Sequence, residues 1–116
     1  MRNEGLTILS ENHDDVVIVS MGGKLDTATS AEAEAYLTNI VTGSGANKLL
    51  LNFDELKFIS SAGLRVVLAT TKKLKGMGGD LKLCHLSPIV KEVFDISGFS
   101  MIIKVYGTKD EALPTF

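Results

Sequence analysis

DELKFISSAGLRVVLATTKKLKG, the stretch from Asp54 to Gly76, carries the clearest structural pattern in this chain. Directly before it, the short apolar run 48–53 predicts a buried strand. Within it, core-facing positions recur at helical spacing, so one face of a helix should point inward. These positions are Leu64, Val67, Leu68, Thr71 and Leu74. The stretch therefore predicts a strand, a short loop at 60–63 and an amphipathic helix.

The loop places two serine hydroxyls, Ser60 and Ser61, at the start of the predicted helix. Small polar residues at this position can accept hydrogen bonds from the free backbone N–H groups of the first turn. The same position favours an anion, because the N–H groups and the helix dipole both point toward it. Two interpretations follow: one of the serines only caps the helix, or a serine here is a phosphorylation site.

These residues resemble the signature of the STAS domains, the sulfate transporter and anti-sigma factor antagonist family. The family pattern is a hydrophobic strand, then Asp/Asn-Phe/Leu, then Phe-Ile/Met-Asp-Ser-Ser/Thr-Gly-Leu-Gly, then an apolar helix. The matching segments here are 51–54 and 58–65, and their alignment on Gly63-Leu64 puts Ser61 at the family's phosphorylatable serine. Three residues depart from the pattern: Ser60 replaces Asp, Ala62 replaces the second Ser/Thr, and Arg65 replaces Gly.

Length and composition limit the classes of protein that fit. The 116 residues are enough for one domain, 1–116, with one core. A net charge of −2 argues against nucleic-acid binding, which needs a basic surface. The single cysteine, Cys84, excludes an internal disulfide and a multi-cysteine metal site. With no signal peptide and no apolar run near about 18 residues, no membrane association and a cytoplasmic location are expected.

The N-terminal part predicts a hairpin and then a helix. Strands are expected at 6–9 and 16–21, on either side of the polar turn 11–15, with Gly22-Gly23 ending the second strand. The segment 23–26 matches the Gly-x-Leu-Asp of STAS domains. Thr29 to Glu32 fits a capping box, and the following helix, stopped by Gly43 and Gly45, should bury Ala33, Leu37, Ile40 and Val41. Asp26 either lies beside the 60–63 loop or serves only as a turn or capping residue.

The C-terminal part predicts two more strands and two more helices. Asp80 to Cys84 should form a strand, and Ser87-Pro88 should begin a helix that ends at Gly98. The apolar face of that helix should contain Ile89, Val90, Val93, Phe94 and Ile96. A strand is expected at 101–106, followed by a capping box from Thr108 to Glu111 that opens a short final helix.

The order ββαβαβαβα predicts an α/β fold with a mixed, mostly parallel five-stranded sheet. The N-terminal hairpin supplies its antiparallel part, and about four helices accompany it. The STAS resemblance implies that the helices lie mainly on one face of the sheet. Periodicity alone would also allow a doubly wound sheet.

No catalytic or cofactor motif is evident in the sequence. A P-loop is missing, and His13 and His85 lack the cysteine or carboxylate neighbours of a metal site. Ser61, His85 and Asp26 could be assembled into a triad, but the Gly-x-Ser-x-Gly pattern of such a nucleophile is missing. Cys84 ends an apolar strand and is expected in the core. We therefore expect no enzyme activity, no metal and no cofactor.

The resemblance implies an anti-sigma factor antagonist that regulates transcription by partner switching. Such a protein binds a serine-kinase anti-sigma factor when unphosphorylated, is switched off by phosphorylation, here at Ser61, and is restored by a PP2C-type phosphatase. The expected partner-binding residues are Asp26, Ser60, Ser61, Ala62, Gly63, Leu64 and Arg65. Two alternatives remain: a non-switching scaffold or accessory subunit, for example of a lipid-transport ATPase complex, and a small esterase with Ser61 as nucleophile.

Overall fold

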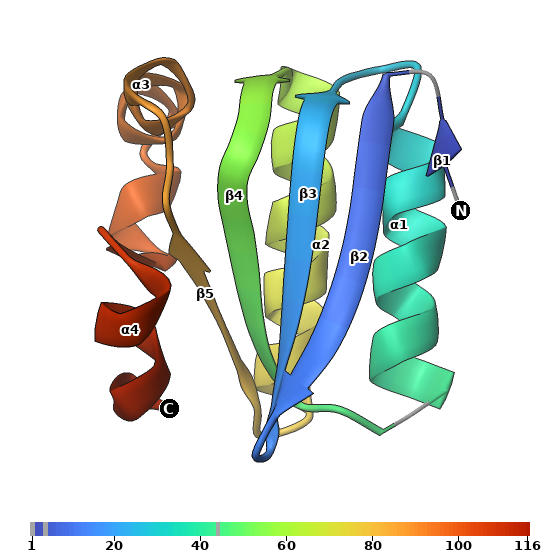
Figure 1. The fold of residues 1–116 in the computed structure, drawn as a ribbon, viewed down its shortest axis with the longest axis vertical. Helices are drawn as coiled ribbons and strands as arrows, with labels where there is room; N and C mark the ends of the chain where they lie inside the picture. The colour runs from blue at the N-terminus through green and yellow to red at the C-terminus, as the bar shows by residue number, and fades with distance from the viewer. Residues whose placement is uncertain (1, 4, 44) are drawn as a thin grey trace.

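The computed structural model describes residues 2–3, 5–43 and 45–116, which form a single sheet accompanied by helices (Figure 1). The strands are β1 (Arg2–Asn3), β2 (Leu6–His13), β3 (Val16–Leu25), β4 (Lys48–Ile59), β5 (Asp80–Cys84) and β6 (Lys104–Tyr106). The helices are α1 (Ser30–Thr38), α2 (Ser61–Gly76), α3 (Pro88–Ser97) and α4 (Lys109–Ala112). A π-helical turn follows α1 at Asn39–Gly43, and 3-10 turns follow α3 and α4 at Phe99–Met101 and Leu113–Thr115.

Within the described residues, the sheet order is β1-β2-β3-β4-β5-β6. The pairs β1–β2 and β2–β3 are antiparallel, whereas β3–β4, β4–β5 and β5–β6 are parallel. The predicted mixed, mostly parallel sheet with an N-terminal hairpin is therefore confirmed, and the two-residue β1 extends its edge. The loops that follow neighbouring parallel strands lie at the same end of a sheet. The loops after β3 and β4 are therefore expected to lie together.

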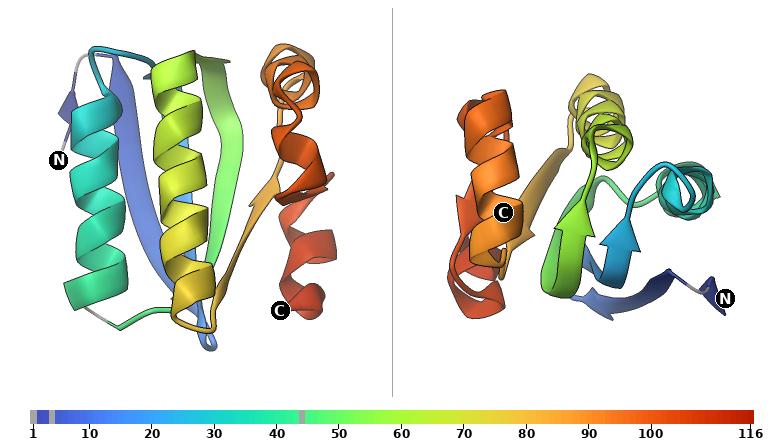
Figure 2. Two further views of the ribbon diagram at one scale, coloured as in Figure 1. Left: turned by 180° about the vertical axis from the view of Figure 1, so that it is seen from behind. Right: turned by 90° about the horizontal axis from the view of Figure 1, so that it is seen from above.

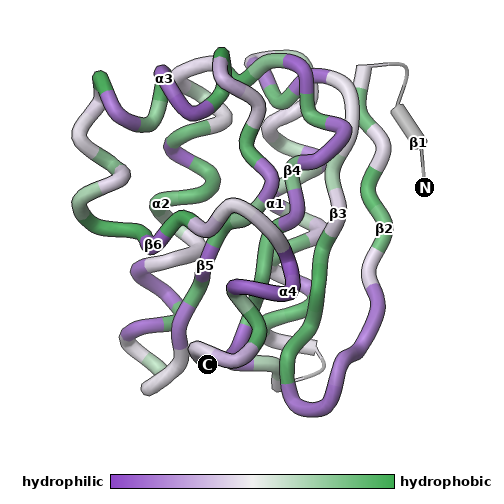
Figure 3. Tube along the Cα trace, turned by 60° about the vertical axis from the view of Figure 1, so that its left-hand side comes forward, coloured by the Kyte–Doolittle hydropathy of each residue, from purple (hydrophilic) through white to green (hydrophobic). Residues whose placement is uncertain are grey.

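The main core lies between the sheet and the helices α1 and α2, which cover one face side by side (Figure 2). Side chains alternate across a strand, so Leu49, Leu51 and Phe53 of β4 face this core. Leu50 points to the other face, where Ala112 of α4 helps to cover it. The hydropathy colouring in Figure 3 shows β3 as hydrophobic along the part that follows the polar β2–β3 turn. Burial on both faces explains that continuous apolar pattern.

Lys82 of β5 is a buried charge on the second face. Its Nζ donates to the backbone oxygen of Thr115 at 2.7 Å and to the Thr115 hydroxyl at 2.8 Å. It also lies 4.7 Å from the ring centroid of Phe116, within reach of a cation–π contact. These contacts satisfy the cation and hold the C-terminal turn against the sheet.

The prediction that Gly22-Gly23 ends the second strand is wrong, because β3 continues through both glycines to Leu25. The pairing between β3 and β4 shifts register on either side of this pair. A Cβ at Gly22 would lie 2.9 Å from the Thr7 hydroxyl, and Gly23 has φ of +90°. Glycine at these two positions permits a close approach to Thr7 and a positive φ, and so allows the strand to continue through both register shifts.

Other strand boundaries also differ from the sequence prediction. The polar segment 11–13 belongs to β2, because it pairs with 16–18 of β3, and the turn itself is Asp14-Asp15. β4 continues past Phe53 to Ile59, where it still pairs with β3. In both cases pairing with the partner strand continues the ladder through polar residues that would not be expected in a strand on their own.

The prediction of a strand at 101–106 is only partly correct. Met101 ends a 3-10 turn and is 90% exposed, and the N–H of Ile103 donates to the carbonyl of Phe99 at 2.9 Å. Only Lys104–Tyr106 pairs with β5. Only the last three residues of β5 take part in this pairing. The residues 101–103 therefore have no partner strand, although their side chains are typical of a strand.

The C-terminal helices begin as predicted, but the apolar face of α3 is only partly buried. Ser87 caps α3 and Gly98 ends it with φ of +82°. Val90 and Phe94 are buried, and the Phe94 ring lies 6.5 Å from that of Phe53. The predicted burial of Ile89 and Ile96 is wrong, since they are 65% and 80% exposed. The capping box of α4 is confirmed, with both of its hydrogen bonds at 3.1 Å.

Candidate functional site

The 60–63 loop and the turn that contains Asp26 lie together at one end of the sheet. The backbone N–H of Ser60 donates to the carbonyl of Leu25 at 2.9 Å, and Leu25 pairs with Ile59 in the parallel β3–β4 ladder. Asp26 and Ser61 are the residues next to this bonded pair. The prediction that they share one edge of the sheet is confirmed, since neighbouring strands lie only about 4.8 Å apart.

The two serines of the loop have different structural roles. Ser60 is the N-cap of α2, and its hydroxyl accepts a 3.4 Å hydrogen bond from the N–H of Gly63. Ser61 is the first residue of the helix and is exposed. The Ser61 hydroxyl makes no hydrogen bond to any residue that the structure describes. The predicted position of Ser61 at the helix start is thus confirmed, and the capping role belongs to Ser60.

Asp26 organises the turn between β3 and α1. One carboxylate oxygen, Oδ1, accepts from the N–H of Ala28 at 3.0 Å and from the N–H of Thr29 at 3.2 Å. Asp26 therefore has the turn role that the sequence allowed, in addition to its place beside Ser61. The predicted capping box from Thr29 to Glu32 is wrong, because the Thr29 hydroxyl instead donates to the carbonyl of Lys24 and accepts from the N–H of Asp26.

Gly63 and Leu64 lie beneath the surface of the loop, whereas Arg65 is exposed. A Cβ on Gly63 would lie 2.6 Å from the carbonyl oxygen of Leu25 and 2.8 Å from Cγ1 of Ile59. Only glycine permits this close approach of helix to strand. Leu64 belongs to the main core. These two residues position the loop, while Ala62 is half-buried beside Ser61.

Phe58 is a surface residue of this edge that the sequence analysis treated only as part of the motif. It pairs with Lys24 across the β3–β4 ladder and is 43% exposed. In the alternation of β4, Phe58 precedes the buried Ile59 and follows the exposed Lys57. This local break from an apolar-in, polar-out pattern is the sequence signal that could have identified it.

The side chains proposed for an esterase triad are engaged elsewhere. Nε2 of His85 accepts a hydrogen bond from the N–H of Lys109 at 3.1 Å, at the start of α4, and its Nδ1 lies 3.9 Å from Oδ1 of Asp54. Asp26 is committed to its turn. Among the described residues, neither group makes a hydrogen bond with Ser61, so no base is paired with this hydroxyl.

The described residues give no sign of a metal or membrane-spanning element. Residues 2–3, 5–43 and 45–116 hold no group of three His, Cys, Asp or Glu side chains that could bind a metal ion. No helix within the same ranges has both the length and the apolar character needed to cross a bilayer.

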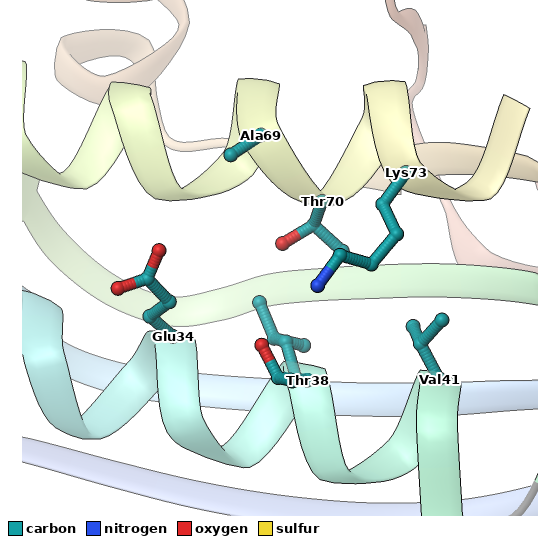
Figure 4. Close-up of a pocket in the computed structure, with 7 residues that line it drawn as sticks. Glu34, Thr38, Val41, Ala69, Thr70 and Lys73 are labelled. Carbon is teal, nitrogen blue, oxygen red and sulfur yellow. The ribbon is translucent and has the colours of Figure 1, made fainter. Parts of the chain in front are cut away.

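A cavity of about 30 Å³ between α1 and α2 could hold about one water molecule (Figure 4). Its lining is Glu34, Leu37, Thr38, Val41, Ala69, Thr70 and Lys73.

Cys84 is fully buried at the end of β5, as predicted for a core residue. Burial raises the pKa of its thiol to about 11, with the Lys109 cation opposing the rise and the Asp54 carboxylate adding to it. A thiol with this pKa is protonated near neutral pH and is a poor nucleophile.

We expect Cys84 to react at least about 100-fold more slowly with a thiol reagent at pH 8 in the folded chain than in denaturant. Because folding raises the pKa, the stability linked to this thiol is complete below pH 9.0 and is lost as the pH approaches about 11. The measurements are absorbance-detected labelling and urea unfolding at several pH values. Labelling at the rate of a free cysteine would show that Cys84 is accessible.

Comparison with known proteins assigns this geometry to a family. The sequence model of the STAS domain matches residues 7–112, which includes both β3 and the 60–63 loop. The chain belongs to the STAS domain family. BtrV of Bordetella bronchiseptica, whose name places it among the anti-sigma factor antagonists, is 40% identical to this STAS domain over 103 residues. That alignment covers 89% of this chain and 88% of BtrV.

Solved structures agree with the sequence relationship. An anti-sigma factor antagonist from Mycobacterium paratuberculosis is similar to this STAS domain with a TM-score of 0.87 and 27% identity, covering 95% of this chain and 92% of that one. The anti-sigma factor antagonist SpoIIAA in its unphosphorylated form gives a TM-score of 0.79 at 25% identity, covering 92% and 93%. The predicted STAS fold is therefore confirmed, and the homologues are regulatory proteins named as anti-sigma factor antagonists.

Proposed function

We propose that this STAS domain is a cytoplasmic anti-sigma factor antagonist that regulates transcription by partner switching. In its unphosphorylated form it binds a serine-kinase anti-sigma factor through the surface around the 60–63 loop, and the sigma factor is released. The names of BtrV, the Mycobacterium paratuberculosis protein and SpoIIAA support the general role. The observation that carries the proposal for this chain is the exposed, unengaged Ser61 hydroxyl among the described residues at the start of α2.

Phosphorylation of Ser61 ends binding in this proposal. The γ-phosphoryl group of ATP is transferred to Oγ of Ser61, ADP leaves, and the hydroxyl proton passes to a base of the kinase. The product carries about −1.5 to −2 charge at pH 7. At a helix N-terminus this charge does not disturb the fold, so its effect falls on the contact with the partner. A PP2C-type phosphatase hydrolyses the phosphoester and restores binding.

Asp26, Ser60, Ala62, Gly63, Leu64 and Arg65 complete the proposed contact surface. The edge shared by Asp26 and Ser61 makes this surface continuous across β3 and β4. Leu64 and Gly63 act mainly through the shape of the loop, because both are buried. Ser61, Arg65 and the partly exposed Asp26 then supply the side chains that a partner can reach.

The test combines phosphorylation with binding. The purified domain is incubated with the serine-kinase anti-sigma factors of its host and ATP, and intact-mass and peptide analysis locate any phosphate. Domain purified from the host is analysed in the same way. One phosphate on Ser61, together with complex formation only in its absence, is the expected result. If no host kinase modifies Ser61 or binds the domain, the switch is refuted, and the non-switching scaffold suggested by Ser60 in place of the family's Asp becomes the better function.

A further inference from the structure

The exposed side of α2 is strongly basic and begins at the proposed phosphorylation site. The helix contains Arg65, Lys72, Lys73 and Lys75 but no Asp or Glu. All four cations are exposed, and none of them forms an ion pair with a residue that the structure describes. The chain as a whole has a net charge of −2, so the positive charge of this helix is opposite in sign to the net charge of the chain.

Among the four cations of α2, Arg65 is the one nearest to Ser61 and lies one turn further along the helix. Residues four apart are neighbours on a helix surface. Side chains of a helix also tend to point back toward its N-terminus, so a side chain as long as arginine at position 65 can reach toward Ser61. Lys72 is eleven residues beyond Ser61, about 16 Å along the helix axis, which exceeds the screening length of about 8–10 Å in physiological salt.

Two of the three departures from the family pattern make this loop more positive. Ser60 stands where the pattern has a negative Asp, and Arg65 stands where it has an uncharged Gly. The nearest acidic group across the two loops, Asp26, has one carboxylate oxygen occupied by its own turn. A phosphate on Ser61 would therefore meet the free N–H groups of the helix start and the Arg65 guanidinium.

We propose that Arg65 pairs with the phosphate of phosphorylated Ser61 across one turn of α2. Whether the Arg65 guanidinium is available to a partner then depends on the phosphorylation state of the domain. In the unphosphorylated chain the guanidinium is exposed and available to an acidic group of a partner. In the phosphorylated chain the same guanidinium is held by the phosphate, so modification adds an anion and removes a cation at one place. This inference rests on the proposed switch for its biological role, while the ion pair itself can be measured without any kinase.

The experiment installs phosphoserine at position 61 during translation, in the otherwise unchanged chain and in the variants Arg65→Gln and Lys72→Gln. Glutamine retains the helix propensity of either residue. The second pKa of the phosphate, near 6 in general, is then measured by ³¹P NMR titration. Arg65→Gln should raise this pKa by about 0.2–0.4 pH units, because the cation favours the dianion. Lys72→Gln should change it by less than about 0.1 unit, and 1 M salt should reduce the effect of Arg65→Gln.

Two results would overturn the proposal. Equal pKa values in the parent and Arg65→Gln proteins would mean that no pair forms. Equal shifts in Arg65→Gln and Lys72→Gln would mean that the phosphate senses only the general charge of the helix. Failure of the proposed function would be seen separately, as the absence of a kinase that modifies Ser61, and it would leave the titration result unchanged.

Discussion

Ser61→Asp is expected to lower the affinity for the serine-kinase partner by at least about 30-fold, a loss of about 2 kcal/mol or more. The carboxylate places a fixed negative charge on an exposed residue at the centre of the proposed contact surface. The fold itself tolerates that charge, because it lies at a helix N-terminus. Calorimetry or surface plasmon resonance with the purified kinase measures the affinity.

Ser61→Ala is the matched variant and should bind as the parent protein does but accept no phosphate. Its hydroxyl makes no hydrogen bond within the described residues, so its removal should leave the fold unchanged. Circular dichroism must show both variants folded before their affinities are compared. Equal binding by Ser61→Asp and Ser61→Ala would refute the charge mechanism.

Ser60→Ala serves as the internal control for the site assignment. It removes the N-cap of α2, which costs about 0.5–2 kcal/mol of stability, but it should leave phosphorylation at Ser61 intact. If a kinase modifies Ser60 and leaves Ser61 free, the alignment with the family pattern is displaced by one residue and the assigned site is wrong.

Gly63→Ala is expected to destabilise the domain by about 1–3 kcal/mol, or more if the loop cannot adjust. The added methyl would lie 2.6 Å from the carbonyl oxygen of Leu25 and 2.8 Å from Cγ1 of Ile59. Both neighbours belong to the ends of paired strands, so the start of α2 must move away from the sheet. For a domain of this size each kcal/mol lowers the melting temperature by about 4–8 °C, which differential scanning calorimetry can measure.

Gly76→Ala provides a control at the other end of the same helix. Apart from its chain neighbours and the backbone of its own helix, no described atom lies within 4 Å of a Cβ built at Gly76, and its backbone does not have positive φ. Alanine there should be neutral or stabilise by up to about 1 kcal/mol, as expected for a helical position. Equal stability of Gly63→Ala and the parent protein would contradict the close packing of α2 on β3 and β4. In that case the loop could not be regarded as fixed by Gly63.

The sequence by itself determined the elements whose signals lie within a few residues of one another. The apolar run 48–53 correctly predicted the core strand, although not its continuation to Ile59, and the periodicity from Leu64 to Leu74 correctly predicted α2. Ser87-Pro88 and the Thr108–Glu111 capping box correctly predicted the starts of α3 and α4. Such signals are local hydrogen bonds and side-chain periodicities. They operate before any distant part of the chain is in place.

Only the tertiary structure decided where β3 ends, which side of α3 is covered and how the site is assembled. Gly22-Gly23 would end an isolated strand, but pairing with β2 and β4 carries β3 through them. Met101 and Ile102 look like strand residues but find no partner, and Ile96 finds no surface to cover it.

The same holds for the site. The turn of Asp26 and the loop of Ser61 are far apart in sequence and meet only because β3 and β4 pair in parallel, with the Ser60 N–H bonded to Leu25. The division between Ser60 as cap and Ser61 as free hydroxyl likewise depended on where α2 begins against the sheet. Strand pairing and burial are relations between distant segments, and a local pattern contains no information about which partner will be present.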